Sequence, residues 1–346
     1  MQALLVGCGG MANVWVKAIT QRPYVADRVN LVGLVDRSPK TAQDLAAVSG
    51  LEGLPIFASV DEAMQSVDCD LVFDVTPPEA RASVVRAALI AGKHVLSEKP
   101  MANSMAEARE LTDLARSSNR LFAVTQNRRY KDGIRRIRAF LDSGALGEVT
   151  GIHADFFIGA HFGGFRDQMD HVLLLDMAIH HFDAARFLCG QNAGSVFCQE
   201  TNPTGSWYAH GASAFAIFEM EHGPFFTYRG SWCAEGKRTS WDAAWRITGT
   251  RGTLTWDGLE QFEAHVTNSD EGFLRPLKQI DVPMAPDPRE TEDHASVLAA
   301  FLDALETGQT AETDSTDNLH SLAMVFGAIE SAKAGRKINI AQEITH

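Results

Sequence analysis

The chain has 346 residues, of which 45% are hydrophobic and 22% are charged, and its formal net charge at pH 7 is −13. At roughly 100–200 residues per domain, this length predicts two domains. The acidic balance argues against a nucleic-acid or anionic-membrane partner, because phosphate groups attract basic surfaces. We therefore expect neither kind of partner.

The five cysteines are scattered along the chain, and none forms a C-x-x-C pair. This pattern is typical of reduced thiols in a cytoplasm rather than of a disulfide framework or a zinc site, so we expect no metal. The first residues lack the basic segment and long apolar run of a signal peptide. The sequence has no stretch of about 18 apolar residues, so we expect no transmembrane helix. We expect a cytoplasmic protein.

In about the first 125 residues, short apolar runs alternate with longer amphipathic stretches rich in alanine. Strands are expected at residues 3–6, 31–35, 71–75, 94–96 and 121–125. Helices are expected between and after them, at residues 11–19, 40–48, 80–91, 105–116 and 131–141. This alternation indicates βαβ units and a parallel sheet, and the apolar strands indicate a sheet covered on both faces. The fold class is therefore α/β, with an N-terminal doubly wound Rossmann domain.

After about residue 148 the pattern changes to alternating apolar and polar residues bounded by turns, which favours an antiparallel sheet. Strands are expected at residues 149–158, 213–220, 225–230, 243–248, 252–256 and 260–266. One long helix is expected at residues 169–188, and two more near residues 292–306 and 316–334. We predict a Rossmann domain over residues 1–125 and an α+β domain over residues 126–346. The alternative is a first domain that reaches about residue 148 and takes back C-terminal helix segments.

A glycine-rich turn follows the first expected strand and precedes the first expected helix. It has the G-x-G-x-x-A pattern of a dinucleotide-binding turn. In such a turn Gly7 permits the sharp bend, Gly9 lets the backbone approach a pyrophosphate, and Ala12 allows close packing of helix on strand. Gly10 and Met11 complete the loop, and the helix N-terminus offers N–H groups to the phosphates. The alternative is an ordinary glycine-rich turn.

Asp36 ends the second expected strand. A carboxylate there accepts hydrogen bonds from the ribose hydroxyls and repels a 2′-phosphate, so we expect NAD as the cofactor. Arg37 follows directly and can stack on adenine or pair with a 2′-phosphate, which leaves NADP open. The alternative for Asp36 is a cap on the helix that starts near Pro39.

The buried strand expected near residues 94–97 ends in Glu98, Lys99 and Pro100. In open α/β sheets, ligands bind beyond the carboxyl ends of the strands. A lysine at that edge, beside a nicotinamide, is a fixed cation that favours a developing alkoxide. The alternative is a surface turn.

The long helix expected at residues 169–188 carries Asp176, His180 and Asp183. Their spacing of four and then three residues places all three on one helical face. A carboxylate one turn from an imidazole holds its tautomer and raises its basicity, which suits a general base. His181 points to another side, where we expect a structural or rim residue. The alternative, a polar stripe on a solvated helix, conflicts with the apolar run just before it.

Taken together, these motifs resemble those of the Gfo/Idh/MocA oxidoreductases. The resemblance rests on the glycine-rich turn, the Thr-Pro-Pro of residues 76–78, the Ser-Glu-Lys-Pro-Met-Ala of residues 97–102 and the D-x-x-x-H-x-x-D of residues 176–183. The Gly-Thr-Arg-Gly-Thr-Leu of residues 249–254 is similar to a turn in the family's second sheet. The motifs follow the family's order, and the domain arrangement covers essentially the whole chain.

The resemblance implies a Rossmann domain followed by an open antiparallel sheet that is often used for dimer or tetramer contacts, so we expect a homodimer or homotetramer. It implies that Lys99 is the catalytic lysine, that His180 is the acid/base, and that Asp176 positions the substrate and His180. The expected cofactor-binding set is Gly7, Gly9, Gly10, Met11, Ala12, Asp36, Arg37, Thr76, Pro77, Glu98 and Lys99.

The sequence departs from the family pattern at two places. The family usually has a histidine four residues after the proline that corresponds to Pro77, and this chain has Arg81 there. The small, glycine-rich lead-in before the Asp-x-x-x-His motif is replaced by the apolar residues 172–175. Neither change touches the expected catalytic atoms, but both affect the geometry on the substrate side.

We expect an NAD(P)-dependent dehydrogenase in which a hydride passes between the nicotinamide and a secondary alcohol of a sugar, polyol or sugar derivative. His180 takes the hydroxyl proton, Lys99 stabilises charge on the oxygen, and Asp176 holds the geometry. The candidate substrate contacts are Asn127, Arg128, Tyr130, His161, Arg166 and Asp176, with a polar and aromatic cluster at Trp207, Tyr208 and His210.

Three other functions stay open. One is glycoside cleavage or elimination without net redox change, through transient oxidation. Another is a cofactor-sensing regulator without catalysis, against which an intact set of Lys99, Asp176 and His180 argues. The last is a structural or interaction protein, which the clustered site residues disfavour most.

Overall fold

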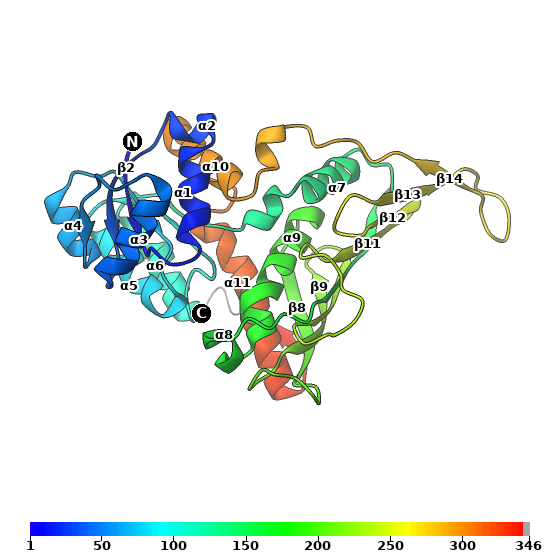
Figure 1. Ribbon diagram of the computed structural model, residues 1–346. Helices are drawn as coiled ribbons and strands as arrows, with labels where there is room; N and C mark the ends of the chain where they lie inside the picture. Colours follow the sequence, from blue (N-terminus) through cyan, green and yellow to red (C-terminus); the bar gives the residue numbers. More distant parts are fainter. Residues whose placement is uncertain (342–346) are drawn as a thin grey trace. The chain divides into compact units, whose positions relative to one another are not determined.

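The computed structural model describes residues 1–341, and the chain divides into two compact units (Figure 1). The first unit comprises Met1–Tyr130 and Glu292–Leu319, and the second comprises Lys131–Thr291 and the segment that starts at His320. The first unit thus extends a few residues beyond the boundary at residue 125 and includes one of the C-terminal helices.

The first unit is built on a six-stranded parallel sheet in the order β3-β2-β1-β4-β5-β6. Its strands are β1 (Gln2–Val6), β2 (Asn30–Val35), β3 (Ile56–Phe57), β4 (Leu71–Asp74), β5 (His94–Ser97) and β6 (Phe122–Val124). Most strand residues are buried, as a sheet covered on both faces requires. The predicted α/β class is confirmed. Strand β3 was missed because two residues are too few to show a period.

Two sets of helices pack around this sheet. One set is α1 (Ala12–Thr20), α2 (Pro23–Ala26), α3 (Pro39–Ser49) and α10 (His294–Thr307), and the other is α4 (Val60–Ser66), α5 (Pro78–Ile90) and α6 (Met105–Ser117). Helices α3, α4 and α6 each begin after a serine whose hydroxyl accepts a hydrogen bond from a first-turn N–H. Phe301 of α10 lies against Phe73 of β4 with 6.5 Å between ring centroids, which explains why this late helix belongs to the first unit.

The second unit is built on a nine-stranded sheet in the order β14-β13-β12-β11-β7-β10-β9-β8-β15. Strands β7 and β10 pair in parallel, and the other neighbouring pairs are antiparallel, so the predicted mainly antiparallel sheet is confirmed. The strands are β7 (Val149–Phe157), β8 (Ala193–Thr201), β9 (Ser213–Met220), β10 (Phe225–Ser231), β11 (Ala244–Gly249), β12 (Gly252–Trp256), β13 (Phe262–Thr267), β14 (Leu277–Ile280) and β15 (Ile338–Asn339).

The segment between β7 and β8 differs from the single long helix expected at residues 169–188. It contains α8 (Phe165–Gln168), a π-helical turn (Leu173–Ala178) and α9 (Ile179–Cys189). His171 has a φ of 52°, a left-handed conformation that a right-handed helix excludes, so the helical run begins only after it. Phe182 of α9 packs on Phe218 of β9 at 4.8 Å between ring centroids, which holds this helix on the sheet.

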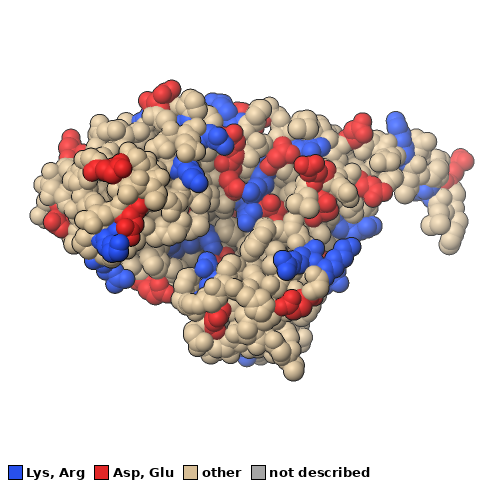
Figure 2. Space-filling model, viewed as in Figure 1, with Lys and Arg blue, Asp and Glu red and all other residues tan. Residues whose placement is uncertain are grey.

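Two further helices complete the second unit, α7 (Asp132–Asp142) and the latter part of α11 (Ser315–Ala334), which begins in the first unit. Within residues 1–341, no helix combines the length and the apolar character that crossing a bilayer requires. Acidic and basic side chains are interspersed over the face shown in Figure 2. The net charge is therefore not gathered into one patch on that face.

Candidate active site

The glycine-rich turn lies between strand β1 and helix α1. Gly7 has a φ of +92°, and a Cβ there would lie 2.7 Å from the carbonyl oxygen of Val75, so only glycine fits. A Cβ on Gly9 or Gly10 would meet no described atom outside the turn within 4 Å. The backbone is therefore open in front of the N-terminus of α1, the place where dinucleotide folds bind a pyrophosphate.

Asp36 follows strand β2 and is hydrogen-bonded to the glycine-rich turn. Its Oδ2 accepts from the backbone N–H of Cys8 at 2.9 Å, and its Oδ1 accepts from the N–H of Ser38 at 2.8 Å. The cap of helix α3 is Ser38, whose hydroxyl accepts from the N–H of Thr41, so Asp36 does not cap that helix. Burial and the charge of Asp36 raise the pKa of the Cys8 thiol to about 12, so the thiol stays neutral. Arg37 is exposed.

Glu98, Lys99 and Pro100 follow strand β5 at the carboxyl edge of the parallel sheet. Glu98 is 7% exposed, and its Oε1 accepts from the indole N–H of Trp15 at 2.8 Å and lies 3.2 Å from Nε2 of His294. Burial raises the pKa of Glu98, but the hydrogen bond and charge of His294 and the Trp15 hydrogen bond outweigh it and lower the pKa to about 2. Glu98 is thus an anchored, ionised carboxylate, whereas Lys99 is half-buried.

Thr76 and Pro77 follow strand β4 at the same edge of the sheet. Asp74, the last residue of β4, is 0% exposed and accepts from the backbone N–H of Thr76 at 3.0 Å and from its hydroxyl at 2.5 Å. The hydroxyl of Ser97, the last residue of β5, donates to the other oxygen of Asp74 at 2.7 Å. One buried carboxylate therefore joins the ends of the two strands from which Thr76 and Lys99 project.

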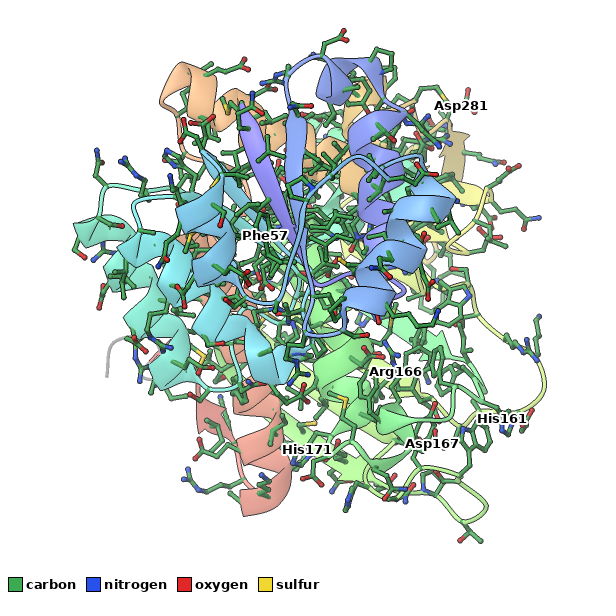
Figure 3. All side chains as sticks on the ribbon, turned by 60° about the vertical axis from the view of Figure 1, so that its left-hand side comes forward. Phe57, His161, Arg166, Asp167, His171 and Asp281 are labelled. Atoms are coloured by element: carbon green, nitrogen blue, oxygen red, sulfur yellow. The ribbon has the colours of Figure 1, made fainter. Side chains whose placement is uncertain are left out.

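In the second unit, Asp176 lies in the π-helical turn and pairs with Arg166 of α8, which Figure 3 labels. The Nε of Arg166 is 2.8 Å from Oδ2 of Asp176, and its Nη2 is 3.3 Å from Oδ1. The guanidinium also lies over the rings of Phe162 and Phe165, at 5.0 and 4.8 Å from their centroids. The carboxylate expected to position the substrate is therefore held by a cation from the preceding segment.

His180 is in the first turn of α9 and is 7% exposed. Asp176 lies in the wider π-helical turn, which bonds residues five apart, so Asp176, His180 and Asp183 do not belong to one regular α-helix as expected. Asp183 is fully buried and accepts from the hydroxyl of Ser321 at 2.5 Å, which is a packing role. His181 is 1% exposed and stacks on the ring of Tyr228, as expected of a structural residue.

Two family models match this chain. One, described as the oxidoreductase family with an NAD-binding Rossmann fold, matches residues 1–126, and the other, the GFO/IDH/MocA C-terminal domain, matches residues 134–255. The chain belongs to the Gfo/Idh/MocA family of oxidoreductases. The resemblance inferred from the motifs is confirmed, and so is NAD as the cofactor of the family's Rossmann domain.

Relatives of this Gfo/Idh/MocA chain match it over nearly its full length. It is 26% identical to dTDP-3,4-didehydro-2,6-dideoxy-alpha-D-glucose 3-reductase of Streptomyces violaceoruber (97% of this chain, 96% of the relative) and 25% identical to inositol 2-dehydrogenase of Rhizobium meliloti (97% and 98%). A solved oxidoreductase from Agrobacterium radiobacter, in complex with NAD+, L-tartaric acid and magnesium, has a TM-score of 0.86 at 21% identity and 99% coverage of both chains. At 21% identity, this structural similarity shows that the two chains share a fold.

The expected substrate contacts of the first unit lie in the 3-10 helix Asn127–Tyr130. The substrate contact of Tyr130 stays a prediction, and its side chain is 2% exposed within the hydrophobic core. It is buried because this short helix packs against α10, which returns to the first unit. The amide of Asn127 donates to Asp293 at 2.8 Å, and Arg128 is half-buried.

The expected contacts of the second unit join an aromatic cluster. The exposed ring of His161 stacks on Trp207, with centroids 3.6 Å apart and planes at 18°, and its Nε2 lies 2.9 Å from Oε1 of Glu235. The indole N–H of Trp207 and the hydroxyl of Tyr208 both donate to the carbonyl of Ala160. The segment that carries Arg166 is thereby tied to the loop of Trp207.

Several side chains that contact the site residues of this family member were not found from the sequence. The Arg166–Asp176 pair joins residues on different helical elements. The contacts that hold Glu98 come from Trp15 and His294, which are far apart in the chain. No periodic signal links such residues. One hint of such contacts was present in the sequence, namely Arg81, which departs from the family pattern. Among the described residues, no group of three or more His, Cys, Asp and Glu side chains is arranged to hold a metal.

Proposed function

We propose that this protein is an NAD-dependent dehydrogenase that oxidises, or in reverse forms, a secondary alcohol of a sugar, polyol or sugar derivative. The observation that carries the proposal is the pairing, within the first unit, of an open glycine-rich turn with a half-buried Lys99 at the carboxyl edge of the same sheet. In an oxidoreductase of this family, such an edge is where a nicotinamide and its substrate meet. The names of the two relatives, an inositol dehydrogenase and a sugar reductase, support a polyhydroxylated substrate.

The chain's own residues suit NAD. In this proposal, the backbone of Gly9 and Gly10 and the N-terminus of α1 take the pyrophosphate, with Gly7, Met11 and Ala12 shaping the turn. Asp36 accepts from the adenosine ribose hydroxyls, and its negative charge disfavours a 2′-phosphate, so NAD is preferred over NADP. Its hydrogen bond to Cys8 supports this role, because it fixes the carboxylate beside the phosphate turn.

On the nicotinamide side, Thr76, Pro77 and Lys99 border the cofactor, and the buried Glu98 fixes the backbone that carries Lys99. Bound NAD supplies the hydride acceptor at its nicotinamide ring. A ring nitrogen of His180 takes the hydroxyl proton, and the Nζ of Lys99 donates to the same oxygen and stabilises the charge that develops there.

Asp176 orients the substrate hydroxyl and His180 in this mechanism. Both of its carboxylate oxygens accept hydrogen bonds from Arg166, which fixes the orientation of the carboxylate. The aromatic rings beside Arg166 and the stacked pair of His161 and Trp207 offer apolar faces to a sugar ring.

We also propose that the protein is a homodimer or homotetramer that associates through the second sheet. On the face of β8, β9 and β10 that points away from α9, four apolar side chains are exposed: Phe197, Phe215, Ile217 and Phe225. Such a face is covered most simply by the same face of a second copy.

A panel of inositols, aldoses, aldonic acids and reduced sugars, each with NAD+ and with NADP+, tests the proposed reaction. At least one member of the panel should give reduced-nicotinamide absorbance. This signal should be lost in Lys99→Met, and turnover in His180→Ala should fall by roughly 10²–10⁴-fold. NAD+ binding without any turnover would indicate a cofactor-sensing regulator. Product formation without net NADH would indicate a reaction that uses oxidation only transiently.

A further inference from the structure

Arg81 is a buried arginine in the first turn of α5, at the position where the family pattern has histidine. It is 2% exposed, which is rare for an arginine. Its Nη1 donates to the carbonyl oxygen of Pro100 at 2.6 Å, and its Nη2 donates to the carbonyl oxygen of Thr76 at 2.5 Å. Its Nε lies 3.4 Å from Oδ2 of Asp74. One guanidinium thus contacts the segments that follow both β4 and β5.

The Arg81–Asp74 pair is the centre of a buried polar network. Asp74 is fully buried and binds the backbone and hydroxyl of Thr76 and the hydroxyl of Ser97. Burial raises the pKa of Asp74, and the charge of Arg81 acts against that rise. The two charges therefore depend on each other, since either alone would be a buried ion without its partner.

Charge compensation by itself does not account for this geometry. A buried ion pair contributes little net stability, and an apolar pair of similar volume often replaces it without loss. The two terminal nitrogens of Arg81 instead reach two backbone carbonyls on neighbouring loops, which the planar guanidinium does at fixed separation. A lysine has one nitrogen and cannot hold both carbonyls at that separation.

We propose that Arg81 is a positioning residue for Lys99. It fixes the carbonyl oxygens of Pro100, next to Lys99, and of Thr76, and so sets where the Lys99 backbone lies relative to the Thr76–Pro77 segment. The inference rests on the proposed function, in which Lys99 acts on the reacting oxygen and Thr76 borders the nicotinamide. Its consequence is that activity depends on the two carbonyl bonds of Arg81 and not only on its charge.

Three variants together separate the carbonyl bonds from the charge. Arg81→Met removes both and leaves Asp74 as a buried charge without its cation, so its melting temperature should fall. Arg81→Met combined with Asp74→Asn removes the stranded charge, and the hydroxyl of Ser97 can accept from the new amide, so stability should return. Arg81→Lys keeps a cation but loses the paired carbonyl bonds, so it tests their contribution if the double variant does not fold. The control is Arg86→Met on the same helix, which breaks an exposed pair with Glu110.

Two readouts are needed, and one does not involve activity. Hydrogen exchange of the peptide that covers residues 97–101 should be faster in the double variant and in Arg81→Lys than in wild type or Arg86→Met. With the best substrate of the panel, kcat at saturating NAD+ should fall by about 10- to 100-fold in the same two variants, although the melting temperature of the double variant has recovered. The Arg86→Met control should match wild type in both.

Recovery of kcat together with stability in the double variant would overturn the inference, because Arg81 would then only compensate the charge of Asp74. Unchanged hydrogen exchange at residues 97–101 would also overturn the inference, whatever the value of kcat. Lys99→Met keeps the two hypotheses apart. If that variant is inactive while the Arg81 variants match wild type, only this inference fails, and if it is fully active, the proposed function fails.

Discussion

The guanidinium of Arg166 holds the carboxylate of Asp176 at two points, with Nε 2.8 Å from Oδ2 and Nη2 3.3 Å from Oδ1. The side chain of Asp176 is 13% exposed and that of Arg166 is 32% exposed, so the pair is partly shielded from water. Asp176 lies in a π-helical turn, a feature often found at functional sites. The pair connects the π-helical turn that precedes α9 to the short helix α8.

Removing Arg166 should weaken catalysis more than stability. In Arg166→Gln, Asp176 loses the cation that orients it, and kcat/KM should fall roughly tenfold, or about 1.4 kcal/mol in transition-state stabilisation. Steady-state kinetics and a melting curve check this. The matched control is Arg86→Gln, which breaks an exposed two-point pair with Glu110 between α5 and α6 and should leave kcat/KM unchanged. Equal effects of the two substitutions would contradict the role of Arg166.

Asp36 should decide the cofactor preference. In Asp36→Ala the hydrogen bonds to the ribose are lost and a 2′-phosphate is no longer repelled, so the KM for NAD+ should rise about tenfold, a loss within the range of charged hydrogen bonds. The ratio of kcat/KM for NADP+ to that for NAD+ should rise as well. Asp44→Ala removes an exposed carboxylate on α3 and serves as control. A wild-type preference for NADP+ would refute the assignment directly.

Gly7 and Gly9 of the turn should respond differently to an added methyl group. Gly7→Ala forces a Cβ to within 2.7 Å of the Val75 backbone at a positive φ, so it should lower both stability and NAD+ affinity. Gly9→Ala meets no described atom outside the turn within 4 Å but fills the space proposed for the pyrophosphate. It should weaken NAD+ binding, measured by calorimetry, without lowering the melting temperature.

The control for Gly9→Ala is Gly53→Ala, which adds a methyl group in a similarly open position outside the site. Unchanged NAD+ affinity in Gly9→Ala would show that the pyrophosphate does not lie against this turn.

Glu98 should contribute stability that is lost in acid. Its pKa falls from an ordinary value of 4.5 to about 2 on folding, so its ionised form favours the folded state. The contribution is complete above about pH 4.5 and is lost as the pH falls through about 2, and a shift of this size corresponds to about 3 kcal/mol. Glu98→Gln should therefore be less stable than wild type near pH 6, and the difference should shrink towards pH 2.

Urea unfolding of the two proteins across that range, followed by the fluorescence of Trp15 among the tryptophans, measures the difference. A constant difference at all pH values would mean that Glu98 does not titrate in this window.

The exposed face of the second sheet should hold the assembly together. Phe215→Glu places a charge at its middle, and light scattering should then show monomers where wild type shows a dimer or tetramer. Val48→Glu alters an even more exposed apolar residue on α3 of the first unit and should leave the mass unchanged. A monomeric wild type would refute the proposed assembly outright.

Much of the fold could be predicted because its signals are local. Strands β9 and β12 have the expected bounds, since alternating or turn-bounded apolar runs mark a strand without any knowledge of its neighbours. The short strand β3 and the π-helical turn could not be predicted in this way. Two residues show no period, and a run of leucines is compatible with either type of helix.

By itself, the sequence determined the α/β class, the glycine-rich turn and the identity of Lys99, Asp176 and His180 as candidates, because each depends on residues close together in the chain. Only the tertiary structure decided which side chains hold those candidates. Glu98 is anchored by Trp15 and His294, Asp176 by Arg166, and the loop of Lys99 by Arg81. Such contacts depend on the packing of distant segments, where burial forces each polar group to find a partner, and no local pattern records that choice.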